Sequence, residues 1–222
     1  DLDDAVVIEV YGKQFDWTVR YAGADNNLGA ANVRFIGGLN TVGVISESAY
    51  AKQMAGLDNN IAKAHVQMAE ELNANKRVKI EARFAKMESK KSTLTSLVST
   101  TAKDLLAAAE DDVIVKELHF PVNKTVHLKF RSQDIIHSAY LPHFRVQMNC
   151  VPGMNTDFVF KPTITTEEMR VETANEEFEY VLLCNKICGA AHYNMQLKVI
   201  VESEEDYNKW IAEQTTFAAL NN

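Results

Sequence analysis

The chain is poor in cysteine and proline, with three Cys and four Pro among its 222 residues. Three cysteines are too few for the disulfide framework of a small secreted protein. No run approaches the roughly 18 to 20 apolar residues that a membrane-spanning helix needs. The start at Asp1 also shows no signal peptide. We therefore expect a soluble piece, which could have been cut from a longer protein.

An excess of basic residues is also missing. The formal net charge is −7 and the pI is near 5.4, whereas nucleic-acid binding calls for a basic face. We therefore expect no nucleic-acid partner. An acidic balance favours a cationic partner, attracted over a distance. The 46% hydrophobic content is ordinary for a globular protein with a real core.

Residues 1–21 form the first of three zones and predict a β-hairpin. The run Ala5–Tyr11 is strand-like, and Gly12 separates it from a second apolar pattern in residues 14–21. Side chains that alternate along a strand share one face. In the second pattern these are Phe15, Trp17, Val19 and Tyr21. The hairpin should therefore have an aromatic inner face.

Residues 22–111 form a zone of loops and helices. It is rich in Gly and Asn up to about Val44, and from Ser46 onward it changes to Ala, Lys, Glu, Met and Gln. Those residues favour helices, and their apolar neighbours recur every three or four positions. We expect two or three helices packed as a hairpin, with turns near residues 73–75 and 89–93.

Residues 112–222 predict a β-rich zone that ends in a helix. Short strand patterns separated by Pro and Gly turns indicate a β-sandwich or barrel; they cover residues 112–121, 124–131, 157–160, 177–183 and 196–202. Ser203, followed by three acidic residues, is a helix start signal. This last helix should bury Tyr207, Trp210 and Ile211.

Four potential metal ligands lie within twelve residues, between two of the expected strands: Cys184, Cys188, His192 and Met195. Zinc takes thiolate and imidazole but rarely a thioether. Thiolate, imidazole and Met together suit copper held for electron transfer. A Cys184–Cys188 disulfide is an alternative, but it leaves the other two residues without a role. A second alternative is a structural zinc module that uses both thiolates and two imidazoles. The third cysteine, Cys150, is expected to be a small buried hydrophobe and not a ligand.

His137 is the best candidate for a further ligand from elsewhere in the chain. It follows the strand expected to end near Arg131, where a loop could face the metal loop. His119 and His127 fall inside expected strands, and we predict that they are exposed. His143 follows Pro142 and should be exposed near the site.

These motifs together resemble a known family. His137-Ser, then Pro152-Gly153, then Cys-x-x-x-Cys-Gly-x-x-His-x-x-Met from residue 184 resemble the soluble domain of cytochrome c oxidase subunit II, which carries the binuclear copper centre CuA. The resemblance covers roughly residues 5–21 and 112–211. It implies a mainly β, cupredoxin-like Greek-key sandwich with a C-terminal helix. Residues 22–111 would then contain an inserted α-helical hairpin.

The resemblance also implies a role for each side chain. Cys184 and Cys188 would bridge two coppers, His137 and His192 would each bind one copper, and Met195 would be a weak ligand. The domain would accept an electron from a c-type cytochrome and pass it to haem in the catalytic subunit I, where oxygen is reduced. The CuA domain of a nitrous-oxide reductase shares the ligand loop and is the alternative.

Two positions depart from the family pattern. Lys186 stands where the family usually has Glu, whose backbone carbonyl binds copper and whose carboxylate reaches a magnesium ion. The carbonyl of Lys186 would still bind copper, but we expect the magnesium contact to be lost. Phe15 stands where the family has the tryptophan that receives the electron, with Trp17 preserved. Entry could therefore use Phe15, Trp17, Tyr140 or His143.

The family's location and partners follow from the same resemblance. It implies the periplasmic face of a bacterial inner membrane, with two N-terminal transmembrane helices that this chain lacks. A basic cytochrome would dock on acidic residues near the copper loop, for which the candidates are Asp157, Glu176, Glu177 and Glu179.

Overall fold

A computed structural model describes residues 2 and 4–221. The chain divides into two compact units, which are described separately. One unit comprises Asp1–Leu28 and Asp111–Phe217, and the other comprises Gly29–Glu110 and Ala218–Asn222. The sequence predicted boundaries at 21/22 and 111/112 and assigned residues 112–222 to the β domain. Residues 22–28 instead extend the β unit beyond its first hairpin, and residues 218–222 group with the helical unit.

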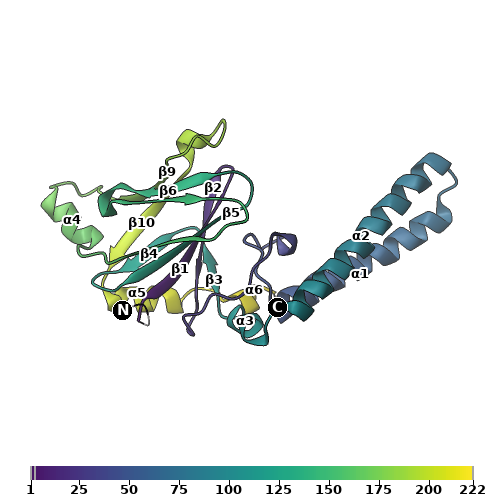
Figure 1. Cartoon of the computed structure of the whole chain (residues 1–222), viewed down its shortest axis with the longest axis horizontal. Coiled ribbons are helices and arrows are strands. Elements are labelled where there is room, and N and C mark those ends of the chain that lie inside the picture. The colour runs from purple at the N-terminus through teal and green to yellow at the C-terminus, as the bar shows by residue number, and fades with distance from the viewer. Residues whose placement is uncertain (1, 3, 222) are drawn as a thin grey trace. The chain divides into compact units, whose positions relative to one another are not determined.

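The β unit is a sandwich of two five-stranded sheets, with strand orders β3-β2-β1-β5-β8 and β4-β10-β9-β6-β7 (Figure 1). The strands are β1 Val6–Lys13, β2 Asp16–Tyr21, β3 Val113–Val115, β4 Leu118–Pro121, β5 Val126–Ser132, β6 His137–Leu141, β7 Val146–Cys150, β8 Thr156–Phe160, β9 Tyr180–Cys184 and β10 Gln196–Glu202. β1 and β2 form the expected antiparallel hairpin. β1 is parallel to β5, and β10 is parallel to β4. These features confirm the cupredoxin-like sandwich.

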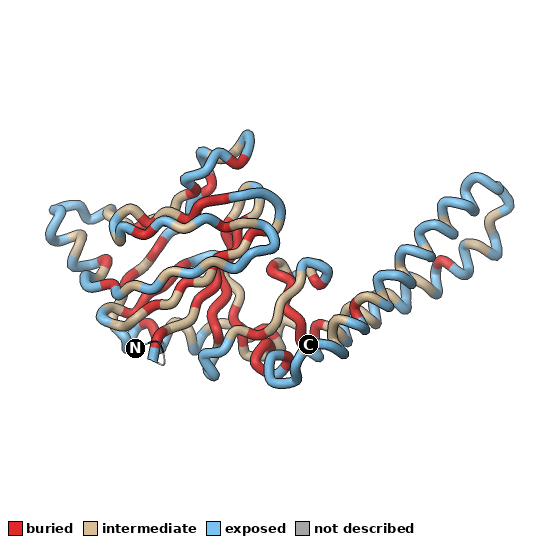
Figure 2. The backbone as a smooth tube through the Cα atoms, viewed as in Figure 1, coloured by how far each residue is buried: buried red, intermediate tan, exposed pale blue. Residues whose placement is uncertain are grey.

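The core lies between the two sheets. In β5, Val126, Leu128 and Phe130 are fully buried, while the residues between them are half-buried. This alternation places every second side chain in the interior. Trp17 in β2 is also fully buried, which confirms an aromatic inner face for the hairpin. Figure 2 shows buried residues along strands of both sheets.

The expected strand over residues 112–121 is in fact two strands. β3 pairs with β2 in one sheet and β4 pairs with β10 in the other, because the chain crosses between sheets at Lys116 and Glu117. The Lys116 amine donates to the carbonyl of Trp17, at 3.2 Å, and to the hydroxyl of Thr18, at 2.8 Å. A run of strand-forming residues does not by itself reveal such a crossing.

The prediction that His119 is exposed was wrong. Its side chain is buried because α5, Glu204–Ala212, covers this edge of the sheet. The ring stacks on Trp210 with a centroid separation of 3.7 Å, and Nδ1 lies 2.7 Å from a carboxylate oxygen of Glu202. His127 is half-buried beside Asp157.

The start of α5 is as predicted. The Ser203 side chain accepts from the backbone N–H of Asp206, and three acidic residues occupy the first turn. Of the three side chains expected inside, Tyr207 is buried, while Trp210 and Ile211 are half-buried.

A further helix, α4 Thr166–Glu172, was not anticipated. Its signal was the sequence Thr-x-x-Glu, which forms a capping box.

The helical unit contains an antiparallel hairpin of α1, Glu47–Glu70, and α2, Ala74–Thr100. The expected turn near residue 73 is present, with Asn73 as the N-cap of α2. The expected turn at residues 89–93 was wrong, because α2 runs through it. No Gly or Pro interrupts that stretch, and the Thr93 hydroxyl donates to the Ser89 carbonyl within the helix.

Short helices complete the described residues: η1 Val33–Phe35, α3 Lys103–Ala108, η2 Pro142–Phe144, η3 His192–Asn194 and α6 Phe217–Asn221. None of the helices among residues 2 and 4–221 is long and apolar enough to cross a membrane.

Candidate metal centre

The predicted metal loop joins two neighbouring antiparallel strands at one end of the sandwich, opposite α5 (Figure 1). β9 ends at Cys184 and β10 begins directly after Met195. The Cys184 N–H donates to the Met195 carbonyl at 3.0 Å, which closes the loop. His137 begins β6, the strand beside β9. Register therefore brings His137 to the same end, although 47 residues separate it from Cys184.

The structure brings the side chains of the predicted site together. The Sγ atoms of Cys184 and Cys188 lie 3.8 Å apart. Nδ1 of His137 is 3.8 Å from the Cys184 sulfur, and Nδ1 of His192 is 3.4 Å from the Cys188 sulfur. The Met195 sulfur lies 3.8 Å from that of Cys188. Each thiol therefore has one imidazole beside it.

The carbonyl of Lys186 also faces the cluster. It accepts from the Cys184 thiol at 3.3 Å, while the Lys186 side chain is exposed. This backbone oxygen is therefore available as a metal ligand whatever side chain residue 186 carries.

The spacing of the two sulfurs fits a shared metal ion. At a metal–sulfur distance of about 2.3 Å, an ion touching both Cys184 and Cys188 would subtend a sulfur–metal–sulfur angle near 110°, which is close to tetrahedral. The ligand atoms of His137, Cys184 and Cys188 all lie within 4.8 Å of one another. The donor set of thiolate, imidazole and thioether is the one that copper prefers.

The cluster is withdrawn from solvent. His137 is fully buried, and Cys188 and Met195 are 1% and 2% exposed. Burial, with the adjacent Cys184 thiol, raises the pKa of Cys188 to about 11. A metal ion must therefore displace a proton from this thiol when it binds. Cys150 is buried as predicted, and burial raises the pKa of its thiol to about 12.

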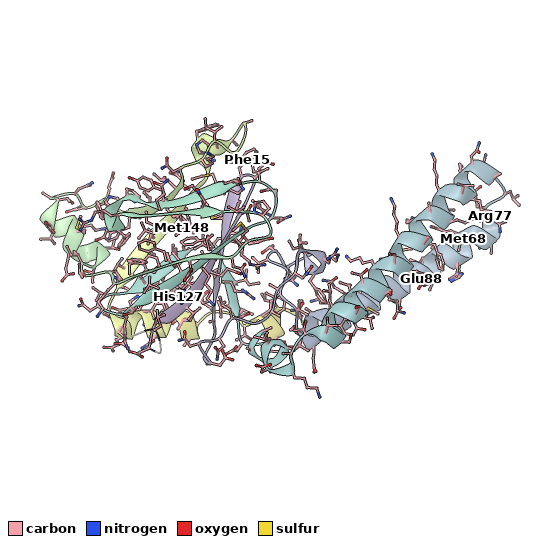
Figure 3. The ribbon with its side chains drawn as sticks, in the orientation of Figure 1. Phe15, Met68, Arg77, Glu88, His127 and Met148 are labelled. Carbon is pink, nitrogen blue, oxygen red and sulfur yellow. The ribbon has the colours of Figure 1, made fainter. Side chains whose placement is uncertain are left out.

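The turn between β1 and β2 holds the metal loop from one side. The Gln14 side-chain amide donates to the Cys188 carbonyl at 2.6 Å. The Trp17 indole N–H donates to the Met195 carbonyl at 3.4 Å, and its ring meets His137 edge-on with centroids 5.9 Å apart. Figure 3 shows Phe15 beside the metal loop.

Gly189 is needed where Phe15 approaches the loop. Its φ of +132° is a conformation that favours glycine. A Cβ atom at this position would lie only 2.8 Å from two carbons of the Phe15 ring. The glycine after Cys188 therefore allows an aromatic ring to pack directly on the metal loop.

Asp134 orients the His137 ring. Its Oδ1 lies 2.9 Å from Nε2 of His137, and its Oδ2 accepts from the Gln14 backbone N–H at 2.7 Å. Partial burial alone would raise the pKa of Asp134, but hydrogen bonds from the Gln14 backbone, His137 and the Ile135 backbone hold it below its usual range. A carboxylate at the free nitrogen of a ligand histidine directs the other nitrogen toward the metal.

Gln14 thus connects both halves of the site, and sequence reasoning missed it together with Asp134. Neither residue belongs to a ligand motif, and only the pairing of β1 with β5 brings the turn near His137.

Tyr140 and His143 are the other two candidates for electron entry, and both follow His137 in the chain. Tyr140 is half-buried within β6. His143 in η2 is exposed as predicted, but its ring packs against Phe178 and Tyr180. Tyr180 begins β9 and Cys184 ends it, so the prediction that His143 lies near the metal loop was wrong.

The acids proposed to meet a basic partner differ in their surroundings. Asp157 lies 2.9 Å from a ring nitrogen of His127, and Glu179 forms an ion pair with Lys198. Glu176 and Glu177 are exposed. Together with Glu179 they precede β9, which ends at Cys184, so the prediction that these three acids lie near the metal loop was wrong.

The profile of the family described as "Cytochrome C oxidase subunit II, periplasmic domain" matches residues 88–203, slightly more than half of the chain. The chain belongs to the cytochrome c oxidase subunit II family. The matched range contains all six residues of the predicted metal site, but Gln14, Phe15 and Trp17 lie outside it.

Two relatives of the chain are named as subunit 2 of a cytochrome c oxidase. The chain is 30% identical over 220 residues to "Alternative cytochrome c oxidase subunit 2" of Bradyrhizobium diazoefficiens, covering 98% of this chain and 54% of the relative. It is 33% identical over 101 residues to cytochrome c oxidase subunit 2 of Thermostichus vulcanus, covering 46% and 27%. The chain therefore spans about half the length of the first relative and about a quarter of the second.

Among solved structures, the chain is similar to the periplasmic domain of subunit II of cytochrome oxidase from Bradyrhizobium japonicum. The TM-score is 0.44 at 15% identity, covering 93% of this chain and 91% of that one.

Proposed function

We propose that this chain is the electron-transfer domain of a haem-copper cytochrome c oxidase and that it holds a binuclear copper centre. Within the family, the observation that carries the proposal is the pair of buried thiols 3.8 Å apart, each with its own imidazole. His137, Cys184, Cys188, His192, Met195 and the Lys186 carbonyl would hold the metal.

Each residue has a defined task in this proposal. Cys184 and Cys188 would each supply a thiolate sulfur to the centre, and His137 and His192 would each supply one imidazole nitrogen. Met195 and the Lys186 carbonyl supply the weaker contacts. Bound copper would supply one-electron redox chemistry. The buried, hydrogen-bonded scaffold keeps the ligands in place in both oxidation states, so little rearrangement opposes electron transfer.

The surroundings support an entry point for electrons at the β1–β2 turn. The half-buried Phe15 ring packs on Gly189, which follows Cys188, and the Trp17 ring contacts His137. We propose that a c-type cytochrome delivers its electron here and that haem in the catalytic subunit receives it. The domain would work at the periplasmic face of the inner membrane. Lys186 would leave the neighbouring magnesium without a carboxylate from this position.

Copper titration of the purified chain tests the proposed function. We expect binding of two copper ions per chain, a purple colour and a multi-line electron paramagnetic resonance signal from one electron shared by two coppers. A colourless protein that holds a single zinc ion would contradict the proposal and support a structural zinc module.

Changing Gln14 tests the positioning of the metal loop. Gln14→Met keeps the side-chain length but removes the donor to the Cys188 carbonyl, so the loop is less well held. Loss of such an outer partner typically costs about tenfold to a hundredfold in metal affinity. Competition with a copper chelator should show a decrease of at least about tenfold, together with a changed absorption spectrum.

A matched control comes from the far end of the same unit. The Gln214 amide donates to the Trp210 carbonyl at 2.9 Å, which is also a side-chain to backbone bond. Gln214→Met should leave copper affinity and spectrum unchanged. Equal affinities for the wild type and Gln14→Met would show that the amide does not position the loop.

A further inference from the structure

The α1–α2 hairpin has a narrow apolar seam and a polar exterior. The seam positions alternate in spacings of three and four, as in an antiparallel coiled coil, and all are apolar except Lys91, which pairs with Asp58. In α1 they are Met54, Leu57, Ile61, Ala64 and Met68, and in α2 they are Ile80, Phe84, Met87, Lys91, Leu94 and Val98. All are half-buried or buried, whereas most other residues of the hairpin are exposed (Figure 2).

Five cations form a continuous stripe along α2. Lys76, Lys79, Arg83, Lys86 and Lys90 are spaced by three, four, three and four residues, and all five are exposed. At about 100° per residue they fall within an arc of about 80°, and at about 1.5 Å per residue the stripe is about 21 Å long. We call these five residues the basic stripe.

The acidic residues of α2 lie on another face. Glu81 and Glu88 fall about 140° to 160° around the helix from Arg83, at about 100° per residue. Figure 3 shows Glu88 part-way along the hairpin, with Arg77 and Met68 nearer the turn. The stripe therefore carries no acidic residue of α2; on the other side of the helix, Arg77 pairs with Glu81.

The neighbouring edge of α1 leaves the stripe available. Arg83 donates to the Gln67 side chain across the seam, which places Gln67 on the same edge. Residues of α1 and its C-cap spaced by three, four or seven from Gln67 are Asn60, Lys63, Ala64, Glu70 and Glu71. This edge adds one cation and two acids, which leaves the combined surface with the five cations of the stripe net positive.

Charge is also unevenly distributed along the chain. Residues 47–100 contain nine of the 23 Lys and Arg residues but only six of the 30 Asp and Glu residues. The hairpin is therefore net positive in a chain whose total charge is −7. A positive face on an otherwise acidic protein fits an anionic partner.

The hairpin also exposes apolar side chains near its turn, at the end where the stripe begins. Leu72 is 97% exposed, Val78 is 62% exposed and Val66 is 56% exposed. These side chains lie at the same end of the hairpin as Lys76, where the stripe begins. Exposed apolar side chains beside lysines are characteristic of surfaces that enter the headgroup region of a lipid bilayer.

We infer that the basic stripe and the exposed Leu72 turn dock the hairpin on an anionic lipid surface. The composition favours lipid over an acidic protein. Four of the five cations are lysine, which protein–protein interfaces use sparingly, whereas arginine and aromatic anchors are enriched there. Lysines on flexible stems suit the diffuse charge of phospholipid headgroups. The docking depends on residues 66–90 alone and does not require the metal centre.

Vesicle binding by the full chain tests this inference. The probes are vesicles of phosphatidylcholine alone and of equimolar phosphatidylcholine and phosphatidylglycerol, sedimented at low and high salt. We expect binding only to the anionic vesicles, with most of it lost at high salt. Lys79→Gln combined with Lys86→Gln should lower the partition coefficient on the order of twentyfold, since each lysine contributes roughly fivefold.

A second double variant separates the stripe from net charge. Lys161→Gln combined with Lys209→Gln removes the same charge from exposed positions in the other unit, and it should bind vesicles like the wild type. Equal losses in both double variants, or no binding to anionic vesicles at low salt, would overturn the inference. Stripe-dependent binding to polyglutamate without binding to vesicles would overturn it in favour of an acidic protein partner.

Discussion

Cys188→Ala is expected to abolish the binuclear copper centre. Cys188 lies next to three other potential ligands, with its sulfur 3.8 Å from that of Cys184, 3.4 Å from Nδ1 of His192 and 3.8 Å from the Met195 sulfur. Its removal leaves one thiolate, which cannot hold two ions in a shared arrangement. We expect a decrease of more than about a hundredfold in affinity for the second copper, beyond what loss of an outer partner causes.

The measurement is copper stoichiometry combined with electron paramagnetic resonance. The variant should bind at most one copper and show the signal of an electron on a single ion. Cys150→Ala is the matched control, because Cys150 is equally buried but lies outside the His137–Cys184–Cys188 group. The control should retain two coppers and the shared-electron signal. Two coppers with that signal in Cys188→Ala would refute the assigned roles.

The ligand loop could be predicted from sequence because its chemistry is local. Cys184, Cys188, His192 and Met195 lie within one loop, and their order alone limits the choice of metal. His137 could be added only because it follows an expected strand and matches a family motif. Its distance from Cys184 depends on the pairing of β6 with β9, which no local pattern specifies.

The supporting residues could not be predicted for the same reason. Gln14 reaches the Cys188 carbonyl across 174 positions of sequence, and a glutamine in a turn carries no sign of that role. For His119 the sequence led to a wrong prediction of exposure. Alternation in β4 made it look exposed, but packing of Trp210 from α5 buried it. The α1–α2 hairpin was predicted correctly, because helix-forming residues and the spacing of the seam are local features. The exception was the turn predicted at residues 89–93, where Ser and Thr occur within α2.

The second large effect is expected at a buried ion network in the β unit. The Arg20 guanidinium lies 3.0 Å from Glu9 and 3.1 Å from Asp112, and all three side chains are at most 4% exposed. Arg131 pairs with the other side of Glu9. Arg20→Met would leave the buried Glu9 with the Arg131 guanidinium alone and would remove the Arg20 guanidinium from the buried Asp112. Loss of one partner from a buried ion pair costs about 3 to 5 kcal/mol, and we expect that decrease in the free energy of unfolding at pH 7.

The pH dependence gives this prediction a second measurement. Burial alone would raise the pKa of Glu9. Arg20 and Arg131 together lower it by more than burial raises it, so the pKa lies below its ordinary value. A lowered pKa stabilises the fold fully above the unfolded-state value of about 4.3, and the contribution is lost as the pH falls through the folded-state pKa. Urea unfolding should therefore show a difference between wild type and Arg20→Met that is largest near pH 7 and smaller below pH of about 4.

An exposed pair provides the control for this comparison. Arg77 lies 3.3 Å from Glu81, with side chains that are 57% and 51% exposed. Arg77→Met should cost less than about 1 kcal/mol, because solvent screens exposed ion pairs. Similar costs for the two arginine variants, or an Arg20→Met cost that does not change with pH, would show that the Glu9 network contributes no more than a surface pair. We expect the larger decrease in the free energy of unfolding because the Glu9 network is buried, and not because it contains more charges than the surface pair.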